Sequence, residues 1–240
     1  MTADGWTDSA QAWIAEQGEA GDFGRRYVLD APMLARIRRQ PFRTALDVGC
    51  GEGRFCRLMQ AEGLHTVGID PTPSLLDRAR HLDPAGDYRL GRAETLDPAD
   101  GVYDLVVSYL TLIDIPDLAA ALPRLAAILR PGGTLLIANL TSFNTAALPD
   151  TWTAGPDGTP RFCIDHYLEE RAVWVQWRGI RVQNWHRPLS AYMTQLLDLG
   201  LQLRHFAEPA PIGADPAKTA LYRRAPFFHI MEWQRPTETD

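Results

Sequence analysis

Short apolar runs alternate with amphipathic stretches through the middle of the chain. Residues 44–48 form a largely apolar run typical of a buried strand, and residues 54–61 repeat apolar positions at helical spacing. The same alternation continues as far as residue 140. It predicts strands at 44–48, 65–69, 88–90, 103–108 and 134–140, with helices at 54–61, from Pro73 onward and at 118–129. Strands and helices that alternate in this way form a parallel sheet with helices on both faces.

Both ends of the chain extend this pattern. Helices are predicted at 8–20 and 24–39, before the first strand, and at 188–199, after the fifth. Strands at 201–206 and 226–233 follow with no helix predicted between them, which favours an antiparallel pair. The predicted fold is therefore an α/β sheet of seven strands, mostly parallel with the last strand antiparallel, flanked by helices.

The segment 141–187 departs from the alternation. Residues 172–177 and 180–185 read as a hairpin around a turn at Arg178-Gly179. Large aromatic residues are frequent here, namely Trp152, Phe162, Tyr167, Trp174, Trp177 and Trp185. Because long connections in compact domains are usually functional, we predict a small substrate cap inserted after the fifth strand. The chain then divides, within one domain of residues 1–240, into N-terminal helices (1–40), a cofactor-binding half (41–140), the cap (141–187) and the rest of the sheet (188–240).

Composition narrows the classes of function. The apolar fraction of 45% excludes a disordered chain. A net charge of −6 without any block of basic residues argues against a nucleic-acid partner. Three cysteines form no C-x-x-C pair, and no metal-ligand set is apparent. The chain has no signal-peptide pattern and no apolar run of about 18 residues, so we expect a cytoplasmic protein with no membrane span. The oligomeric state is left open, a homodimer included.

Residues 45–54 (ALDVGCGEGR) carry the most specific pattern in the chain. Gly49, Gly51 and Gly53 lie between a predicted strand and a helix, where glycine permits positive φ and close approach of a ligand. The spacing is not that of the dinucleotide motif G-x-G-x-x-G, because Arg54 occupies the place of its third glycine. Asp47 before the turn would repel a pyrophosphate and attract an ammonium group. The pattern therefore argues against a nicotinamide enzyme.

The motif D-x-G-x-G-x-G resembles the first motif of class I S-adenosylmethionine-dependent methyltransferases, which have a Rossmann-like fold. The resemblance implies that Asp47, Gly49, Cys50 and Gly51 surround the amino-acid part of this cofactor. Asp70 and Pro71 follow the second strand, where a carboxylate can accept hydrogen bonds from both ribose hydroxyls. The family's fifth motif matches the turn at residues 129–135. The resemblance covers residues 45–140 in several ordered motifs.

The adenine end departs from the family pattern. Members often carry an acidic residue followed by alanine here, whereas this chain has Arg92 before Ala93, and arginine cannot accept a hydrogen bond. We expect the backbone at Ala93 or the side chain of Glu94 to form the hydrogen bonds that recognise the adenine. Ser108 ends the fourth strand at the edge of the sheet where ligands bind. Arg25, in the N-terminal helices, would suit the methionine carboxylate, although helix packing explains it equally well.

Candidate groups for chemistry lie mainly in the cap. His186 and His166 are predicted as a general base or a substrate ligand, with Tyr109 and Asp114 after the fourth strand as further candidates. Arg187 would bind an anionic group of the substrate. Three aromatic residues, Tyr192, Trp185 and Tyr167, complete the predicted substrate site.

The resemblance implies an enzyme that transfers a methyl group from S-adenosylmethionine to a small-molecule metabolite and releases S-adenosylhomocysteine. Oxygen is the preferred acceptor atom. Nitrogen and carbon acceptors remain alternatives, as does a non-catalytic protein that binds S-adenosylmethionine without a substrate pocket. An RNA methyltransferase would need a basic rim around the cleft, which this acidic chain does not show.

Overall fold

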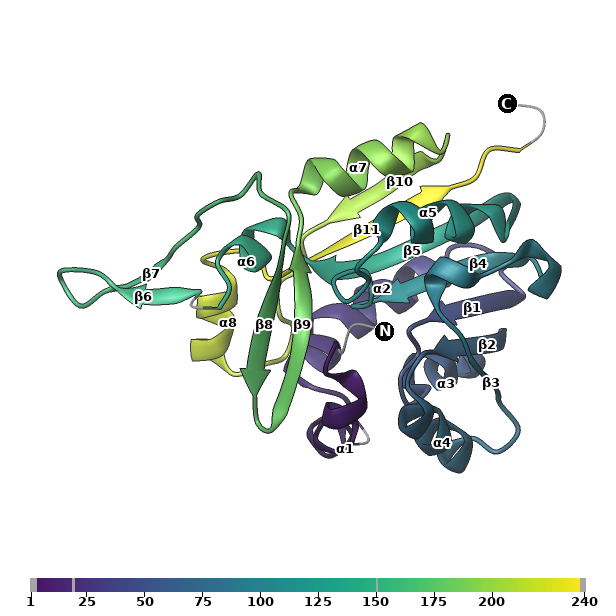
Figure 1. The fold of residues 1–240 in the computed structure, drawn as a ribbon, viewed down its shortest axis with the longest axis horizontal. Coiled ribbons are helices and arrows are strands. Elements are labelled where there is room, and N and C mark those ends of the chain that lie inside the picture. The colour runs from purple at the N-terminus through teal and green to yellow at the C-terminus, as the bar shows by residue number, and fades with distance from the viewer. Residues whose placement is uncertain (1–3, 19, 150, 238–240) are drawn as a thin grey trace.

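A seven-stranded sheet forms the centre of the computed structural model, which describes residues 4–18, 20–149 and 151–237 (Figure 1). Its strand order is β10-β11-β5-β4-β1-β2-β3. The strands are β1 (Thr44–Val48), β2 (His65–Asp70), β3 (Asp87–Leu90), β4 (Tyr103–Tyr109), β5 (Leu129–Leu140), β10 (Gln202–Ala207) and β11 (Phe228–Gln234). Strands β1 to β5 run parallel, and β11 runs antiparallel to both of its neighbours, β5 and β10. The predicted α/β class and the antiparallel last strand are confirmed.

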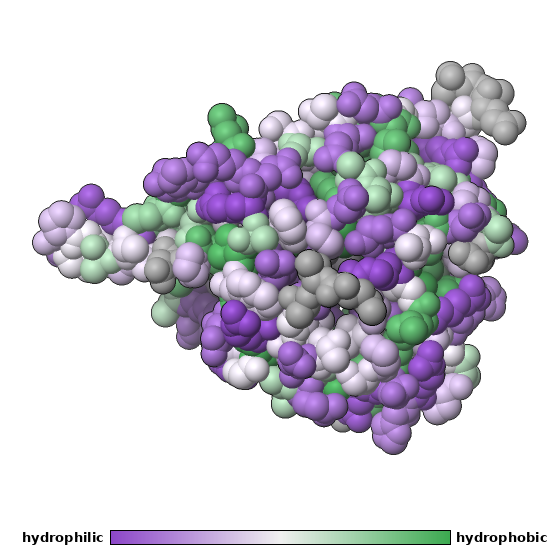
Figure 2. Space-filling view, in the orientation of Figure 1, coloured by the Kyte–Doolittle hydropathy of each residue, from purple (hydrophilic) through white to green (hydrophobic). Residues whose placement is uncertain are grey.

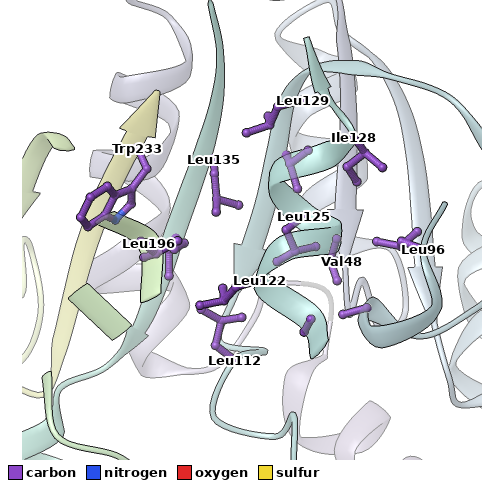
Figure 3. Packing of buried hydrophobic residues seen from close by; sticks show 14 of the residues in the cluster. Val48, Leu96, Leu112, Leu122, Leu125, Ile128, Leu129, Leu135, Leu196 and Trp233 are labelled. Atoms are coloured by element: carbon purple, nitrogen blue, oxygen red, sulfur yellow. The ribbon is translucent and has the colours of Figure 1, made fainter. Parts of the chain in front are cut away.

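Helices cover both faces of this sheet. The helices among the described residues are α1 (Trp6–Gln17), α2 (Asp30–Ile37), α3 (Arg54–Ala61), α4 (Pro73–Leu82), α5 (Leu118–Ala127), α6 (Ser142–Ala146), α7 (Leu189–Asp198) and α8 (Pro216–Tyr222), with a π-helical turn η1 (Arg25–Leu29) and two 3₁₀ turns, η2 (Ala93–Thr95) and η3 (Pro98–Asp100). Apolar residues of α5 and α7 pack on one face, and those of α2 and α3 pack on the other. Figure 3 shows the first of these layers, where Leu122 and Leu125 of α5 face Leu135 of β5. Burial of such side chains is the main favourable term in folding.

Three regions differ from the sequence-based expectations. The predicted helix 24–39 is interrupted, because its first turn is π-helical before α2 begins. Residues 216–222 form α8 where only a loop was expected; Pro216 occupies the first turn, and the Asp215 side chain accepts a hydrogen bond from the backbone N–H of Lys218 at 2.9 Å. The turn expected at residues 129–135 lies within β5, which begins at Leu129 and shifts register against β4.

The segment after β5 forms two hairpins. Strands β8 (Arg171–Trp177) and β9 (Ile180–His186) pair as predicted, and a smaller pair, β6 (Trp152–Ala154) and β7 (Pro160–Phe162), projects from the body (Figure 1). Helix α1 is fastened to β9 rather than to the sheet. The Ser9 hydroxyl accepts from the backbone N–H of Arg181 and donates to its carbonyl, both at 3.0 Å, while Asp4 O accepts from Gln183 N at 2.9 Å. Helix α1 and the β8–β9 hairpin thus make one continuous wall.

The surface carries few extended apolar areas on the face drawn in Figure 2, where hydrophobic residues lie scattered among hydrophilic ones. Among the described residues, no helix has both the length and the apolar character that a membrane crossing requires.

Candidate active site

A cleft opens at the carboxyl ends of β1, β2 and β4, beneath α1. Its two connected parts are lined by Asp4, Trp6, Trp13, Gln17, Arg25, Asp47, Val48, Gly49, Cys50, Gly51, Glu52, Arg54, Phe55, Asp70, Pro71, Thr72, Leu75, Gly91, Arg92, Ala93, Glu94, Tyr109, Leu110, Thr111, Asp114 and Ile115. This is the edge at which open α/β sheets bind ligands. The structure therefore brings together most of the residues that the sequence motifs singled out.

The glycine turn leaves room for a ligand. Gly49 and Gly51 have φ of 72° and 55°, in the left-handed region that favours glycine. A Cβ built on Gly51 would meet nothing nearer than Trp13 Nε1 at 4.0 Å, so the space between the turn and α1 is open. Beneath the turn, Asp47 Oδ2 accepts a weak hydrogen bond from the Cys56 thiol at 3.5 Å, and Oδ1 has no partner among the described residues. Burial raises the pKa of Asp47 to about 7.

Asp70 fixes the other side of the turn. Its carboxylate accepts hydrogen bonds from the backbone N–H of Gly51 at 2.9 Å and of Thr72 at 2.8 Å. Burial is the main cause that raises the pKa of Asp70 above its usual range. A carboxylate has about four acceptor positions, so two remain for hydroxyl donors in the cleft.

Arg25 lies at the point where the two parts of the cleft meet, at the first position of the π-helical turn η1. Its guanidinium is 2.5 Å from Asp22 Oδ2 and lies over the ring of Trp13 at 4.7 Å from the centroid. Tyr109 forms the floor below it, stacked on Phe55 at 4.6 Å between centroids. π-Helical turns occur frequently at functional sites, and here the turn places a cation over the cleft.

A larger cavity of about 450 Å³ adjoins the cleft on the side of the β8–β9 hairpin. It is mostly apolar and aromatic, and its lining comprises Trp6, Trp13, Glu16, Asp22, Phe23, Gly24, Arg25, Leu110, Ile113, Asp114, Leu140, Asn144, Leu148, Val175, Trp177, Arg178, Val182, Asn184, Lys218, Tyr222, Phe227 and Phe228. Trp6, Trp13, Arg25, Leu110 and Asp114 line both this cavity and the cleft. The cavity and the cleft are therefore neighbouring spaces that share one wall.

Asp114 is the acidic group at this junction. It lies in the loop after β4, and its Oδ1 accepts a hydrogen bond from Asn184 Nδ2 of β9 at 2.6 Å. Burial raises the pKa of the Asp114 carboxyl well above its usual range. A carboxyl with a raised pKa, in a cavity next to a ligand cleft, is a candidate for proton transfer.

Comparison with known proteins gives the family of this architecture. Residues 46–137 match a family model described as "Methyltransferase domain". The S-adenosylmethionine dependent methyltransferase from Mesorhizobium loti superposes with a TM-score of 0.73 at 25% identity, over 84% of this chain and 96% of that one. The chain is similar to class I S-adenosylmethionine-dependent methyltransferases over residues 46–137 and in its fold. The resemblance drawn from the glycine motif is thereby confirmed, together with the family's cofactor.

Curated relatives of this chain act on different molecules. The malonyl-[acyl-carrier protein] O-methyltransferase of Serratia marcescens is 31% identical over 62% of this chain and 56% of its own length. The trans-aconitate 2-methyltransferase of Methylobacterium radiotolerans is 36% identical over 45% of this chain and 42% of its own length. The matched part of the chain thus spans about half the length of these relatives.

The cleft fits S-adenosylmethionine, the cofactor of the family that the chain resembles. The unpartnered Oδ1 of Asp47 suits the ammonium group, and the remaining acceptor positions of Asp70 suit the ribose hydroxyls. At the far end, Arg92 Nε lies 3.8 Å from Glu94 Oε2, so these two side chains pair with each other. Ala93 between them is buried and lines the cleft, as the predicted reading of adenine by its backbone requires. Ser108 differs: its side chain is fully buried in the sheet and does not line the cleft, because Tyr109 takes that place.

Asp47 should release a proton when the methyltransferase binds S-adenosylhomocysteine. With its pKa raised to about 7, Asp47 is largely protonated at pH 6, and an ammonium group beside it favours the ionised form. Affinity should therefore rise with pH up to about 7 and then level off. Calorimetric titrations at pH 6 in buffers of different ionisation enthalpy measure the protons released. In Asp47→Asn, the binding enthalpy should no longer depend on the buffer. If the wild-type binding enthalpy is the same in all buffers, Asp47 does not release a proton when the ligand binds.

His186, the predicted general base, is placed elsewhere by the structure. It is buried, with Nδ1 hydrogen-bonded to Thr145 Oγ1 at 2.8 Å and Nε2 to the Tyr167 carbonyl at 2.9 Å. Both ring nitrogens are thus engaged, and the side chain lines neither the cleft nor the cavity. Its hydrogen bonds connect the end of β9 to α6 and to the loop before β8.

Replacing His186 by alanine should lower stability without affecting the cofactor. The change removes the hydrogen bonds of the ring to Thr145 and to the Tyr167 carbonyl, each worth about 0.5–1.5 kcal/mol, and leaves a void at a buried position. Urea unfolding should show this loss, while titration with S-adenosylhomocysteine should give the wild-type dissociation constant. A loss of cofactor affinity in a folded variant would contradict the packing role.

Other predicted substrate residues also lie outside the cavity. Arg187 is buried, donates to the carbonyls of Leu112, Ile115 and Pro116 at 3.3, 2.8 and 2.9 Å, and pairs with Glu170 at 3.5 Å. It therefore holds the loop that carries Asp114 and does not line the cavity. Tyr192 is buried in the core, Trp185 lies against Arg187, Tyr167 packs on His186, and His166 lies exposed beside Asp165 and Glu169.

Tyr109 lines the cleft but is poorly suited to act as a base. Its hydroxyl donates to Asp30 Oδ1 at 2.8 Å, and burial raises the pKa of Tyr109 well above its usual range. Among residues 4–18, 20–149 and 151–237, no group of three or more His, Cys, Asp and Glu could hold a metal ion.

The residues that sequence reasoning missed come from the end of the chain. Lys218, Tyr222, Phe227 and Phe228 line the cavity from α8 and the start of β11. The amphipathic spacing of Lys218 to Tyr222 was hidden by a segment rich in prolines, which predicted a loop.

Proposed function

We propose that the protein transfers a methyl group from S-adenosylmethionine to an oxygen atom of a small molecule held in the 450 Å³ cavity, in the cytoplasm. The single observation that carries this proposal is the position of Asp114. Its carboxyl lines both the cofactor cleft and the cavity, so a hydroxyl bound against it would face the cofactor. A trans-aconitate 2-methyltransferase among the relatives supports a metabolite acceptor, and a malonyl-[acyl-carrier protein] O-methyltransferase supports oxygen as the acceptor atom.

The cofactor supplies an activated methyl group on its sulfonium. The contribution of this chain is then mainly alignment, which can be worth on the order of 7–11 kcal/mol for well-oriented reactants. The aromatic walls formed by Trp6, Trp13 and Trp177 orient a planar acceptor and exclude water. Asp114 accepts the hydroxyl proton, and Asn184 holds the carboxyl in place through its hydrogen bond.

An amine acceptor is the second candidate. A carboxyl surrounded by aromatic rings also suits an ammonium group, which would bind to the ionised form of Asp114 and give it a proton, so that the neutral nitrogen can attack the methyl group. A non-catalytic protein that binds S-adenosylmethionine is less well supported, because it would not need the cavity.

A turnover assay tests the proposal. Purified protein with S-adenosylmethionine is offered panels of hydroxylated aromatic compounds and of aromatic amines, and S-adenosylhomocysteine formation is measured. Formation with hydroxylated compounds supports the proposal, and formation with amines alone favours the second candidate. If thermal unfolding shows that S-adenosylhomocysteine binds but neither panel is methylated, the hypothesis of a non-catalytic binding protein replaces both enzyme hypotheses. Ligand at about 100 times its dissociation constant should stabilise the fold by roughly 2.7 kcal/mol, and NAD serves as the control.

A further inference from the structure

The cavity contains the only lysine of the chain. The 24 basic residues comprise 23 arginines and Lys218, which lies on α8 and lines the cavity wall. Its Nζ lies over the ring of Phe23 at 3.8 Å from the centroid. Contact with an aromatic face holds an ammonium group without neutralising its charge. Lys218 is thus a cation held at the cavity.

The other charged side chains around the cavity already have partners. Arg178 Nη1 lies 2.7 Å from Glu16 Oε1, and Arg25 pairs with Asp22 at 2.5 Å. Lys218, in contrast, forms no ion pair with any residue in the described part of the chain. The unpaired charges of the cavity are therefore the Lys218 ammonium and, when ionised, the Asp114 carboxyl.

We propose that the acceptor is a planar, mostly apolar molecule that carries a carboxylate, and that Lys218 binds this carboxylate. This inference rests on the proposed function, because it takes the cavity as the acceptor site. A single ammonium group balances one negative charge, whereas phosphate sites usually combine several donors or a bidentate arginine. Here the arginines that line the cavity are occupied by Glu16 and Asp22. A monoanionic carboxylate fits this arrangement better than a phosphate.

The two unpaired charges also set the orientation of the acceptor. Asp114 lies at the cofactor side of the cavity, and Lys218 belongs to a helix that does not line the cofactor cleft. An anionic group is repelled by the Asp114 carboxylate and attracted by Lys218. The acceptor therefore binds with its carboxylate directed to α8 and its hydroxyl directed to Asp114. Lys218 is in this sense a specificity residue that does not touch the reacting atoms.

Binding of matched probes tests this inference. The probes are 4-hydroxycinnamate, 3,4-dihydroxybenzoate and indole-3-carboxylate, each paired with its neutral primary amide, and their affinities are measured calorimetrically with S-adenosylhomocysteine saturating. The wild-type protein should bind the acids about two- to fivefold more tightly than the amides, a range set by partial screening at an exposed lysine. Lys218→Met should remove the preference because it weakens the binding of the acids and not of the amides, and Lys218→Arg should retain the preference. The preference should also decrease with added salt.

Arg223→Met provides the matched control. Arg223 is exposed just after α8, carries the same charge and does not line the cavity, so its replacement should leave the preference unchanged. Equal wild-type affinity for acids and amides, a preference that survives in Lys218→Met, or no binding of any probe would each overturn the inference. These outcomes are separate from failure of the proposed function: a protein that binds the acids through Lys218 but methylates nothing retains the carboxylate site and loses only the assigned reaction.

Discussion

Replacing Asp114 by asparagine should lower kcat by about 10²- to 10⁴-fold, the range typical for loss of a general acid or base. Asparagine has the same shape and can still accept the hydrogen bond from Asn184, but it cannot take a proton. The pH profile gives a second readout. Because burial raises the pKa of Asp114, kcat/KM of the wild type should rise with pH until this carboxyl ionises. The variant should lack this rise.

Two measurements separate this role from a structural one. The dissociation constant for S-adenosylhomocysteine should stay unchanged in Asp114→Asn, since Asp114 lies at the cavity end of the cleft. Stability at neutral pH should be equal to or higher than that of the wild type, because a folded-state pKa above the unfolded value means that ionisation costs folding free energy as the pH rises. If Asp114→Asn keeps the wild-type kcat and the rise of kcat/KM with pH, Asp114 does not act as the base.

Replacing Asp70 by alanine should weaken the binding of S-adenosylhomocysteine at least tenfold. Each charge-assisted hydrogen bond to a ribose hydroxyl is worth about 1.5–3 kcal/mol, and the change also frees the backbone N–H groups of Gly51 and Thr72. The loss should therefore combine missing contacts with a looser glycine turn. Calorimetric titration at one pH measures it directly.

Asp77→Ala is the matched control for Asp70→Ala. Asp77 is an exposed carboxylate of the adjacent helix α4, paired only with Arg80 at 3.2 Å, and it does not line the cleft. Its loss should leave the affinity at the wild-type value. An unchanged affinity in Asp70→Ala would instead mean that Asp70 serves only the backbone of the turn.

The fold was largely predictable because its elements carry local signals. Buried strands such as β1 and β4 are apolar on both faces, and the glycine turn and Pro73 mark where helices begin. The π-helical turn at Arg25 was not predictable, because a one-residue change of hydrogen-bond partner leaves the helical pattern of apolar residues intact.

The cofactor half of the site was also predictable, since its residues follow directly after strands whose carboxyl ends share one edge. The acceptor half was not, because it depends on which face of the cap meets the cavity. In β9, Val182, Asn184 and His186 alternate onto one buried face. Only Val182 and Asn184 reach the cavity, while His186, at the end of the strand, meets Thr145 of α6. Sequence spacing identifies the shared face but not where along it the cavity ends.

The attachment of α1 to β9 has a consequence for the construction of new variants. Ser9 pairs with the backbone of Arg181, and Trp6 and Trp13 of α1 line the acceptor cavity together with Val175 and Trp177 of the hairpin. The N-terminal helix and a hairpin far along the sequence are therefore one structural module. A graft of another hairpin that leaves α1 behind would separate the two halves of the cavity wall, so acceptor range can be exchanged between such scaffolds only when both segments move together.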